Sequence, residues 1–289
     1  MKRASPYVLL LWALAAGMAP AASIGYADRV TTYTASFELY GEVLVHVHNP
    51  FGDIRVRTTA EAKASIAAVI QPLTSNPNDI TIVRETKADG VHVVVQDVTH
   101  SYRGRVDLSI VVPKPTPLKV IGKDGQVQAK GLSAPISIST RTGEIFVASA
   151  KPVQATTETG EIYLHLTSVA AADQSQLTTN TGDITVRFSG TVSPTVVGQT
   201  TGQTEFRGLA EGSEKTTGLA GNTKTFQLGK GPGIVNMKSQ AGRLTVQIDR
   251  APGGSTSPPH VIKKNLQELP RTQPWREGDP IIEVPKKTR

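Results

Sequence analysis

The sequence predicts an all-β protein, a β-solenoid in which two-strand repeats of about 20 residues stack on one another. Three observations support this prediction. A short phrase of the form Thr-Gly-acid-apolar-x-apolar recurs along the chain, apolar residues alternate with polar ones on both sides of each copy, and neighbouring copies are 17 to 22 residues apart. This period is too short for a repeat of two helices, and it fits two short strands joined by a bend.

The three cleanest copies of the phrase begin at Thr142, Thr159 and Thr181. They read Thr-Gly-Glu-Ile-Phe-Val, Thr-Gly-Glu-Ile-Tyr-Leu and Thr-Gly-Asp-Ile-Thr-Val. Weaker copies contain Gly52, Gly125, Gly202, Gly221 and Gly242. The stretch from Gly202 to Gly221 departs from the pattern, with Thr204 in place of an apolar residue, which predicts a looped-out rung there.

The residue types of each repeat have distinct structural roles. We expect the glycine to supply a positive φ in a tight turn, and the acidic residue after it to face water. The apolar residues that follow, such as Ile145 and Val147, have the period of two that places both on one face of a sheet. One repeat cannot bury its apolar face alone, so the repeats must stack. Ile145, Ile162 and Ile184 are therefore expected to form one interior column.

Residues 1–27 have the layout of a secretory signal peptide. Two basic residues precede an uncharged apolar run at residues 7–16, and small residues follow, so cleavage is expected near Ala22 or Ala27. The protein is thus expected to be exported to the periplasm, the cell surface or the extracellular medium, without a stable membrane span after cleavage. The chain has no cysteine, which excludes disulfides, thiolate metal ligands and lipid attachment to a cysteine.

Residues 28–117 are expected to form a β region that is continuous with the repeats at 118–249. A hairpin is predicted around Lys87–Gly90, because strand-like segments flank this turn sequence. The Ala-rich stretch 60–69 has helical propensity, but its apolar residues keep the period of a strand, and we predict a strand.

The basic character of the sequence is concentrated in a Pro-rich tail, residues 250–289. This tail carries eight basic and four acidic residues, whereas the body between the signal peptide and the tail has 21 basic and 20 acidic residues. Because the body is nearly neutral, a nucleic-acid partner is not expected. Within the tail, Pro280–Val284 could add one strand to the open end of the solenoid.

Three features occur together in this chain. One strand leads through Asn49-Pro-Phe-Gly-Asp-Ile-Arg-Val, a later strand ends in Val111-Val-Pro, and the Thr-Gly-acid-Ile repeats follow. With these features the sequence resembles the bacterial putative-adhesin family of exported β-strand-repeat domains. The resemblance covers most of residues 36–249. It implies the β-repeat fold and an adhesin-type function, and it brings no catalytic residues with it.

An acidic residue follows the glycine in each of the three clean repeats. Glu144, Glu161 and Asp183 would form an acidic ladder if consecutive repeats stack about 4.8 Å apart. Such a ladder could bind calcium or provide the paired carboxylates of a glycoside hydrolase. Ordinary turn chemistry is favoured, because acidic residues are common after turn glycines and no buried partner is evident that would raise a carboxyl pKa. No catalytic residue, cofactor site or metal site is therefore assigned.

Two other groups of residues are candidates for a site. Phe146 and Tyr163 are expected side by side on the outer face, either as a platform for sugars or, as we favour, as a stabilising cross-strand pair. His46 and His48 share one strand face and could start a metal site, but no third ligand is evident, and a polar surface is favoured. The sequence contains no Gly-x-Ser-x-Gly and no phosphate-binding loop.

Two classes of function remain open. The sequence favours a non-catalytic exported protein of the cell envelope, an adhesin or scaffold that binds a glycan or a protein partner through the faces of the solenoid. Its ligand surface would include Phe146, Tyr163, Glu144, Glu161 and Asp183, together with the hydroxyls of Thr140, Thr142, Thr157, Thr159, Thr179 and Thr181. The alternative is a carbohydrate-active β-helix enzyme that uses the acidic ladder. An enzyme should interrupt its repeats with long insertions, and the spacing of 17 to 22 residues leaves little room for them.

Overall fold

The computed structural model describes residues 30–39, 42–73, 76–189, 194–208, 215–220, 222–228, 231 and 233–249. The predictions for the signal peptide, for Gly221 and for the tail at 250–289 lie outside these residues. Among the described residues, no helix is long and apolar enough to cross a membrane. Their regular structure consists of strands, apart from the short 3-10 helix η2 (Pro77–Asp79).

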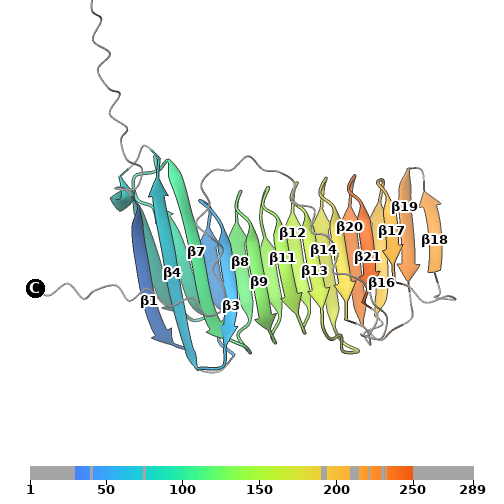
Figure 1. Ribbon diagram of the computed structural model, residues 1–289, viewed down its shortest axis with the longest axis horizontal. Coiled ribbons are helices and arrows are strands. Elements are labelled where there is room, and N and C mark those ends of the chain that lie inside the picture. The colour runs from blue at the N-terminus through green and yellow to red at the C-terminus, as the bar shows by residue number, and fades with distance from the viewer. Residues whose placement is uncertain are drawn as a thin grey trace, which may run out of the picture. The chain divides into compact units, whose positions relative to one another are not determined.

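The strands form two sheets, sheet A with ten strands and sheet B with eleven (Figure 1). Sheet A contains, in spatial order, β1 (Thr31–Glu38), β4 (Lys63–Pro72), β7 (Gly104–Pro113), β3 (Ile54–Thr59), β9 (Val127–Leu132), β11 (Ile145–Ser149), β13 (Ile162–Leu166), β15 (Ile184–Phe188), β21 (Leu244–Ile248) and β17 (Thr204–Arg207). Sheet B contains, in spatial order, β18 (Lys215–Ala220), β19 (Thr223–Leu228), β16 (Thr195–Thr200), β20 (Ile234–Ser239), β14 (Gln174–Thr179), β12 (Val153–Thr157), β10 (Ile136–Ser139), β8 (Leu118–Gly122), β2 (Val45–Asn49), β6 (Gly90–Asp97) and β5 (Ile80–Lys87).

Each repeat forms one rung, which consists of a strand of sheet B, a turn and a strand of sheet A. The rungs from β8–β9 to β14–β15 pair in parallel with their sequence neighbours in both sheets. Apolar residues of both sheets form one hydrophobic core. Within this core Ile145, Ile162 and Ile184 pair in register and are at most 1% exposed. The predicted β-solenoid fold and its interior isoleucine column are thus confirmed.

The glycines of the turns are needed for close stacking and not for a positive φ, which corrects the expectation from the sequence. A Cβ atom at Gly160 would fall on the carbonyl oxygen of Gly143, and a Cβ atom at Gly182 would fall on that of Gly160. Any larger residue would therefore push two rungs apart. Among the described glycines, positive φ values occur elsewhere, at Gly90, Gly131 and Gly208.

A threonine closes these turns from the inside. Thr140, Thr157 and Thr179 are between 1% and 6% exposed, so the prediction that their hydroxyls form part of a ligand surface is wrong. The hydroxyl of Thr179 accepts a hydrogen bond from the backbone N–H of Gly182 at 3.1 Å and donates one to the carbonyl oxygen of Gly160 at 3.3 Å. This hydroxyl therefore joins two rungs through buried polar groups. The other three repeated threonines are exposed as predicted, and they are Thr142, Thr159 and Thr181.

The last rung of the described chain does not lie at the end of the stack. The rung β20–β21 is inserted between β14–β15 and β16–β17, and it pairs in parallel with both. In Figure 1 the orange-red β21 therefore lies to the left of β17, although it comes later in the sequence. The buried hydroxyls follow this spatial order, since Ser239 donates to the carbonyl oxygen of Gly182 at 3.0 Å and Thr200 donates to that of Gly242 at 2.6 Å. Of residues 202–221, for which the sequence predicts a looped-out rung, β17 is a regular strand displaced by one place in the stack, whereas β18 leaves the parallel rungs and pairs antiparallel with β19.

Antiparallel strands lie at both ends of the stack. At one end β1, β4 and β7 pair antiparallel in sheet A, and β5 and β6 form a hairpin in sheet B whose turn lies between Lys87 and Gly90, as predicted. The strand β4 contains most of the stretch 60–69, which confirms the strand predicted there. At the other end β18 and β19 form a hairpin that pairs with β16.

Candidate functional site

The outer face of sheet A carries an aromatic pair near its middle. Phe146 on β11 and Tyr163 on β13 lie directly opposite each other in the parallel register, as predicted. Their ring centroids are 6.2 Å apart, and the ring planes are inclined by 34°. Both side chains are partly exposed. Gln128 on β9 and Thr185 on β15 continue the same row on either side, so the aromatic pair is set within a regular polar row.

A second row lies two residues further along the same strands. It contains Lys130, Ala148, His165, Arg187 and Gln247 in register. The Nε atom of Arg187 lies 2.6 Å from a carboxylate oxygen of Asp249. Hydrogen bonding to Asp249 raises the pKa of Arg187. The ion pair with Asp249 therefore fixes Arg187 in the row that neighbours the aromatic pair.

The three acidic residues predicted as a ladder belong to a mixed polar row at the turn end of the rungs. The side-chain amide of Gln126 donates to a carboxylate oxygen of Glu144 at 3.1 Å. Asp183 accepts a hydrogen bond from the backbone N–H of Arg243 at 2.7 Å. Glu144 and Glu161 are exposed. Glu144 is thus an exposed side chain that is hydrogen-bonded to the neighbouring rung, as expected for ordinary turn chemistry.

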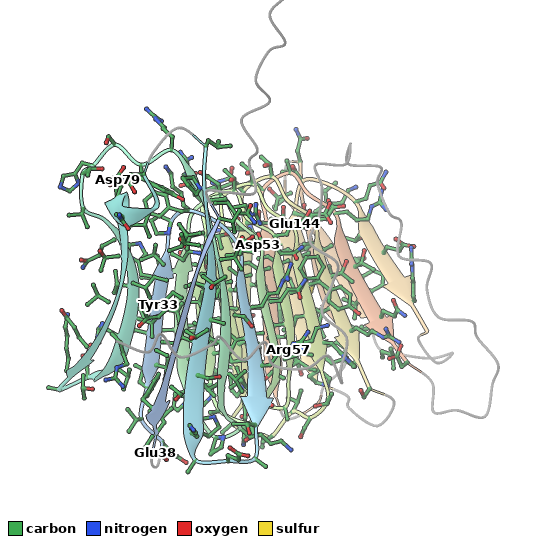
Figure 2. All side chains as sticks on the ribbon, turned by 60° about the vertical axis from the view of Figure 1, so that its left-hand side comes forward. Tyr33, Glu38, Asp53, Arg57, Asp79 and Glu144 are labelled. Atoms are coloured by element: carbon green, nitrogen blue, oxygen red, sulfur yellow. The ribbon has the colours of Figure 1, made fainter. Side chains whose placement is uncertain are left out.

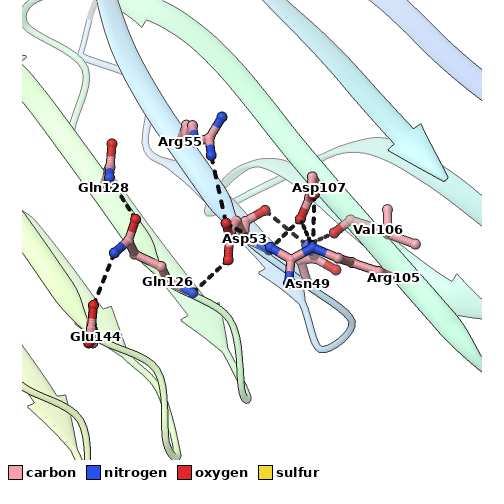
Figure 3. Close-up of polar contacts among 9 residues, drawn as sticks. All are labelled: Asn49, Asp53, Arg55, Arg105, Val106, Asp107, Gln126, Gln128 and Glu144. Carbon is pink, nitrogen blue, oxygen red and sulfur yellow. Dashed lines mark hydrogen bonds and ion pairs between the residues drawn. The ribbon is translucent and has the colours of Figure 1, made fainter. Parts of the chain in front are cut away.

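The Asn49-Pro-Phe-Gly-Asp segment builds a polar network where the stack of rungs begins (Figure 3). The guanidinium of Arg105 on β7 lies 2.7 Å from a carboxylate oxygen of Asp53 and 2.8 Å from one of Asp107. The side-chain amide of Asn49 donates to the carbonyl oxygen of Val106 at 2.7 Å. Burial lowers the pKa of Arg105, but the hydrogen bonds and charges of Asp107 and Asp53 outweigh burial and raise it. The network therefore joins the turn before β3 to β7.

Sequence reasoning recognised the segment around Asp53 but not its partners. Arg105 and Asp107 lie more than 50 residues further along the chain, and the strand pairing that brings them to Asp53 is not encoded in a local pattern. Figure 2 shows Asp53 and Glu144 near the same end of the rungs, with Arg57 further along β3. The segment around Asp53, on which the family resemblance partly rests, thus has a structural role, because it joins the turn before β3 to β7.

A separate group of titratable side chains lies on the outer face of sheet B. His46 on β2 pairs in register with His92 on β6, and their rings stack with centroids 4.2 Å apart and planes inclined by 6°. Asp89, in the turn before β6, contacts both rings. The sequence suggested His46 and His48 as the pair and showed no third ligand. The structure instead groups His46 with His92 and Asp89, and His48 is exposed further along β2.

No protein-family model matches this sequence, and no curated protein matches it. Solved structures do match. A putative cell adhesion protein from Clostridium sporogenes is 13% identical, with a TM-score of 0.39 over 76% of this chain and 100% of that one. A putative adhesin from Bacteroides fragilis is 11% identical, with a TM-score of 0.34 over 76% and 97%. A putative adhesin from Parabacteroides distasonis is 8% identical, with a TM-score of 0.32 over the same shares.

These structural neighbours are bacterial putative adhesins. Their descriptions agree with the family that the sequence resembles. Because their TM-scores are all below 0.5, the fold described above rests on the strand pairings of this chain. Any function must likewise be argued from its own surfaces.

Proposed function

We propose that this protein is a non-catalytic, exported binding protein of the cell envelope that holds a glycan on the outer face of sheet A. The observation that carries the proposal is the in-register pair of Phe146 and Tyr163 within a polar row. Export is supported by the signal-peptide pattern of residues 1–27.

Aromatic side chains suit a sugar ligand because the ring face is apolar while its surroundings are wet. A pyranose ring presents C–H groups on its faces and hydroxyls at its edge. The C–H groups can stack on Phe146 and Tyr163, and the hydroxyls can bind the polar side chains of Gln128 and Thr185 in the same row.

An extended glycan fits this face better than a compact ligand. The outward positions recur from rung to rung with the strand spacing of about 4.8 Å, and polar side chains flank the aromatic pair on both sides, so a linear partner can contact several rungs at once. Several weak contacts along one chain give a higher overall affinity than any single contact. The repeat architecture thus supports recognition of a repetitive partner.

The proposal is tested by screening the exported chain on a glycan array and measuring the Kd of each hit by calorimetry. The double variant Phe146→Ala/Tyr163→Ala should weaken binding by at least about tenfold, as expected for an aromatic hot spot. The matched control is Ser137→Ala/Gln154→Ala, which changes an in-register pair on the outer face of sheet B and should leave the Kd unchanged.

Three results would overturn the proposal. The first is equal loss of glycan binding in both double variants. The second is no glycan binding by the wild type alongside capture of a protein partner. The third is cleavage of a bound glycan that is abolished by Glu144→Gln or Glu161→Gln in a folded protein, which would establish the carbohydrate-active enzyme in place of the binding protein.

A further inference from the structure

We propose that His46, Asp89 and His92 form a binding site for a divalent transition-metal ion, with zinc as the best-matched ion. The three residues offer two imidazole nitrogens and one carboxylate oxygen, and these ligand atoms all lie within 4.8 Å of one another. The site lies on sheet B, and it does not depend on the glycan surface proposed for sheet A.

The fold brings the three ligands together from two strands and a turn. Parallel pairing of β2 with β6 sets His46 directly beside His92. The hairpin turn before β6 is held against the start of β2, because the backbone N–H of Val91 donates to the carbonyl oxygen of Leu44 at 2.9 Å. Gly90 makes this approach possible, since a Cβ atom there would fall on the same carbonyl oxygen. The turn therefore places Asp89 at the two rings.

The distances fit a small metal ion. The Nε2 atom of His92 lies 2.8 Å from Oδ1 of Asp89, and the Nε2 atom of His46 lies 3.5 Å from Oδ2 of Asp89. In a tetrahedral zinc site, bond lengths of about 2.0 to 2.1 Å place neighbouring ligand atoms about 3.3 Å apart. The two observed separations lie on either side of that value. Because each Nε2 lone pair lies in the plane of its ring, coordination of one ion by both nitrogens requires the stacked rings to tilt out of their parallel arrangement.

One of the ligand atoms lacks a hydrogen-bond partner. The Nε2 atom of His46 is buried and forms no hydrogen bond with any residue that the structure describes. Buried polar atoms are nearly always satisfied, and an exception requires an explanation such as a bound ion. A metal ion shared with Asp89 and His92 would satisfy this nitrogen.

The ligand types also indicate which ion fits. Neutral imidazole and ionised carboxylate are the forms that bind metals. Two nitrogen ligands favour zinc over calcium or magnesium, which prefer oxygen ligands.

Two charged side chains flank the cluster on the neighbouring strands. Lys119 on β8 lies in register with His46, and Glu85 on β5 lies in register with His92. Glu85 forms an ion pair with Lys87 at 3.0 Å. The flanking lysine opposes a cation and the flanking glutamate attracts one. The three ligands leave coordination positions open for water or for a group from a binding partner.

The test uses the untagged exported chain, stripped of metal and titrated with zinc chloride or calcium chloride in a calorimeter. Zinc should bind, calcium should not compete with it, and zinc should raise the Tm because it binds the folded state. His46→Gln and His92→Gln should each weaken the strongest zinc-binding event by at least about tenfold. The matched control is His48→Gln, on the same face of the same strand, which should leave this affinity unchanged.

Asp89→Asn provides a second test, because it changes an exposed turn residue without removing a core side chain, and it should also weaken zinc binding. Circular dichroism in EDTA establishes that each variant is folded. The site does not exist if the wild type binds no zinc, or if the His46, His92 and Asp89 variants bind it as tightly as the wild type. Glycan affinity should be the same in zinc and in EDTA, so failure of the metal site leaves the proposed function standing.

Discussion

The hydroxyl of Thr179 accepts a hydrogen bond from the backbone N–H of Gly182, which lies 3.1 Å away in the same turn. The relationship recurs between Thr157 and Gly160 at 3.1 Å, and a serine replaces the threonine in the last described rung. The hydroxyl also donates to the carbonyl oxygen of the neighbouring rung. One side chain thus closes its own turn and fixes the distance to the next rung.

Removal of this hydroxyl should be costly even though the side chain is small. Thr179→Val keeps the shape of the residue but leaves the N–H of Gly182 and the carbonyl oxygen of Gly160 buried without this partner. We expect a loss of about 1 to 3 kcal/mol in the free energy of unfolding, measured in urea. The control Thr181→Val changes an exposed hydroxyl in the same turn and should stay within about 0.5 kcal/mol. Equal losses in the two variants would contradict the bridging role.

A charge in the isoleucine column should be far more damaging. Ile162 is 1% exposed and lies between Ile145 and Ile184. An unpaired carboxylate in Ile162→Asp costs several kcal/mol, a large part of the roughly 5 to 15 kcal/mol that stabilises a typical domain. Ile162→Val should cost only about 0.5 to 1.5 kcal/mol. Thermal unfolding followed by circular dichroism measures both, and an unchanged Tm in the Asp variant would rule out the column.

The close stacking of turn glycines gives a third prediction. Gly160→Ala would force its methyl group onto the carbonyl oxygen of Gly143. The loss of stability should therefore exceed the roughly 0.4 to 1 kcal/mol by which glycine-to-alanine changes alter stability at permissive positions. Gly218→Ala is the control, because a Cβ atom there meets only the side chain of Thr225 in an end hairpin. A small effect at both glycines would mean that the rungs can separate without cost.

The pH dependence of stability should report on His165. Burial lowers the pKa of His165, and the charge of Arg187 lowers it further, while Asp249 opposes both. The unfolded chain, with a histidine pKa near 6.5, then binds more protons than the folded chain. The stability that depends on neutral His165 is fully present above the unfolded pKa of about 6.5. It is lost as the pH falls from there toward the lower pKa of His165 in the folded chain. The Tm of wild type should therefore fall more between pH 7.5 and pH 5.5 than the Tm of His165→Gln. An equal fall would contradict the lowered pKa.

Much of the architecture follows from local patterns. The period of two in each strand and the recurring glycine were enough to predict the rungs, the isoleucine column and the contact of Phe146 with Tyr163. The buried threonines were predictable from the same period, because Thr157 continues the inward sequence of Val153 and Ala155. A hydroxyl nevertheless suggests a surface position. The stacking contacts satisfy that hydroxyl and allow it to be buried.

Long-range pairing accounts for what the sequence did not reveal. Nothing in the segments around His46 and His92 indicates that β2 and β6 lie side by side, since each could pair with other strands of similar composition. The ion pairs of Arg105 with Asp53 have the same origin. Similar rungs also provide similar pairing surfaces, so the order of the last two could not be read from their patterns.

The insertion of β20–β21 limits how this protein can be assembled and lengthened. A chain that emerges amino terminus first produces the rung at 195–207 before the rung that must separate it from β14–β15. The stack therefore cannot be completed by adding each new rung to its free end. The rung β20–β21 must instead be inserted between two rungs that precede it in the sequence. A further repeat placed after residue 249 would find both edges of β20 and of β21 already paired. A longer relative should thus have gained its rungs between β8 and β15, where sequence order and spatial order agree.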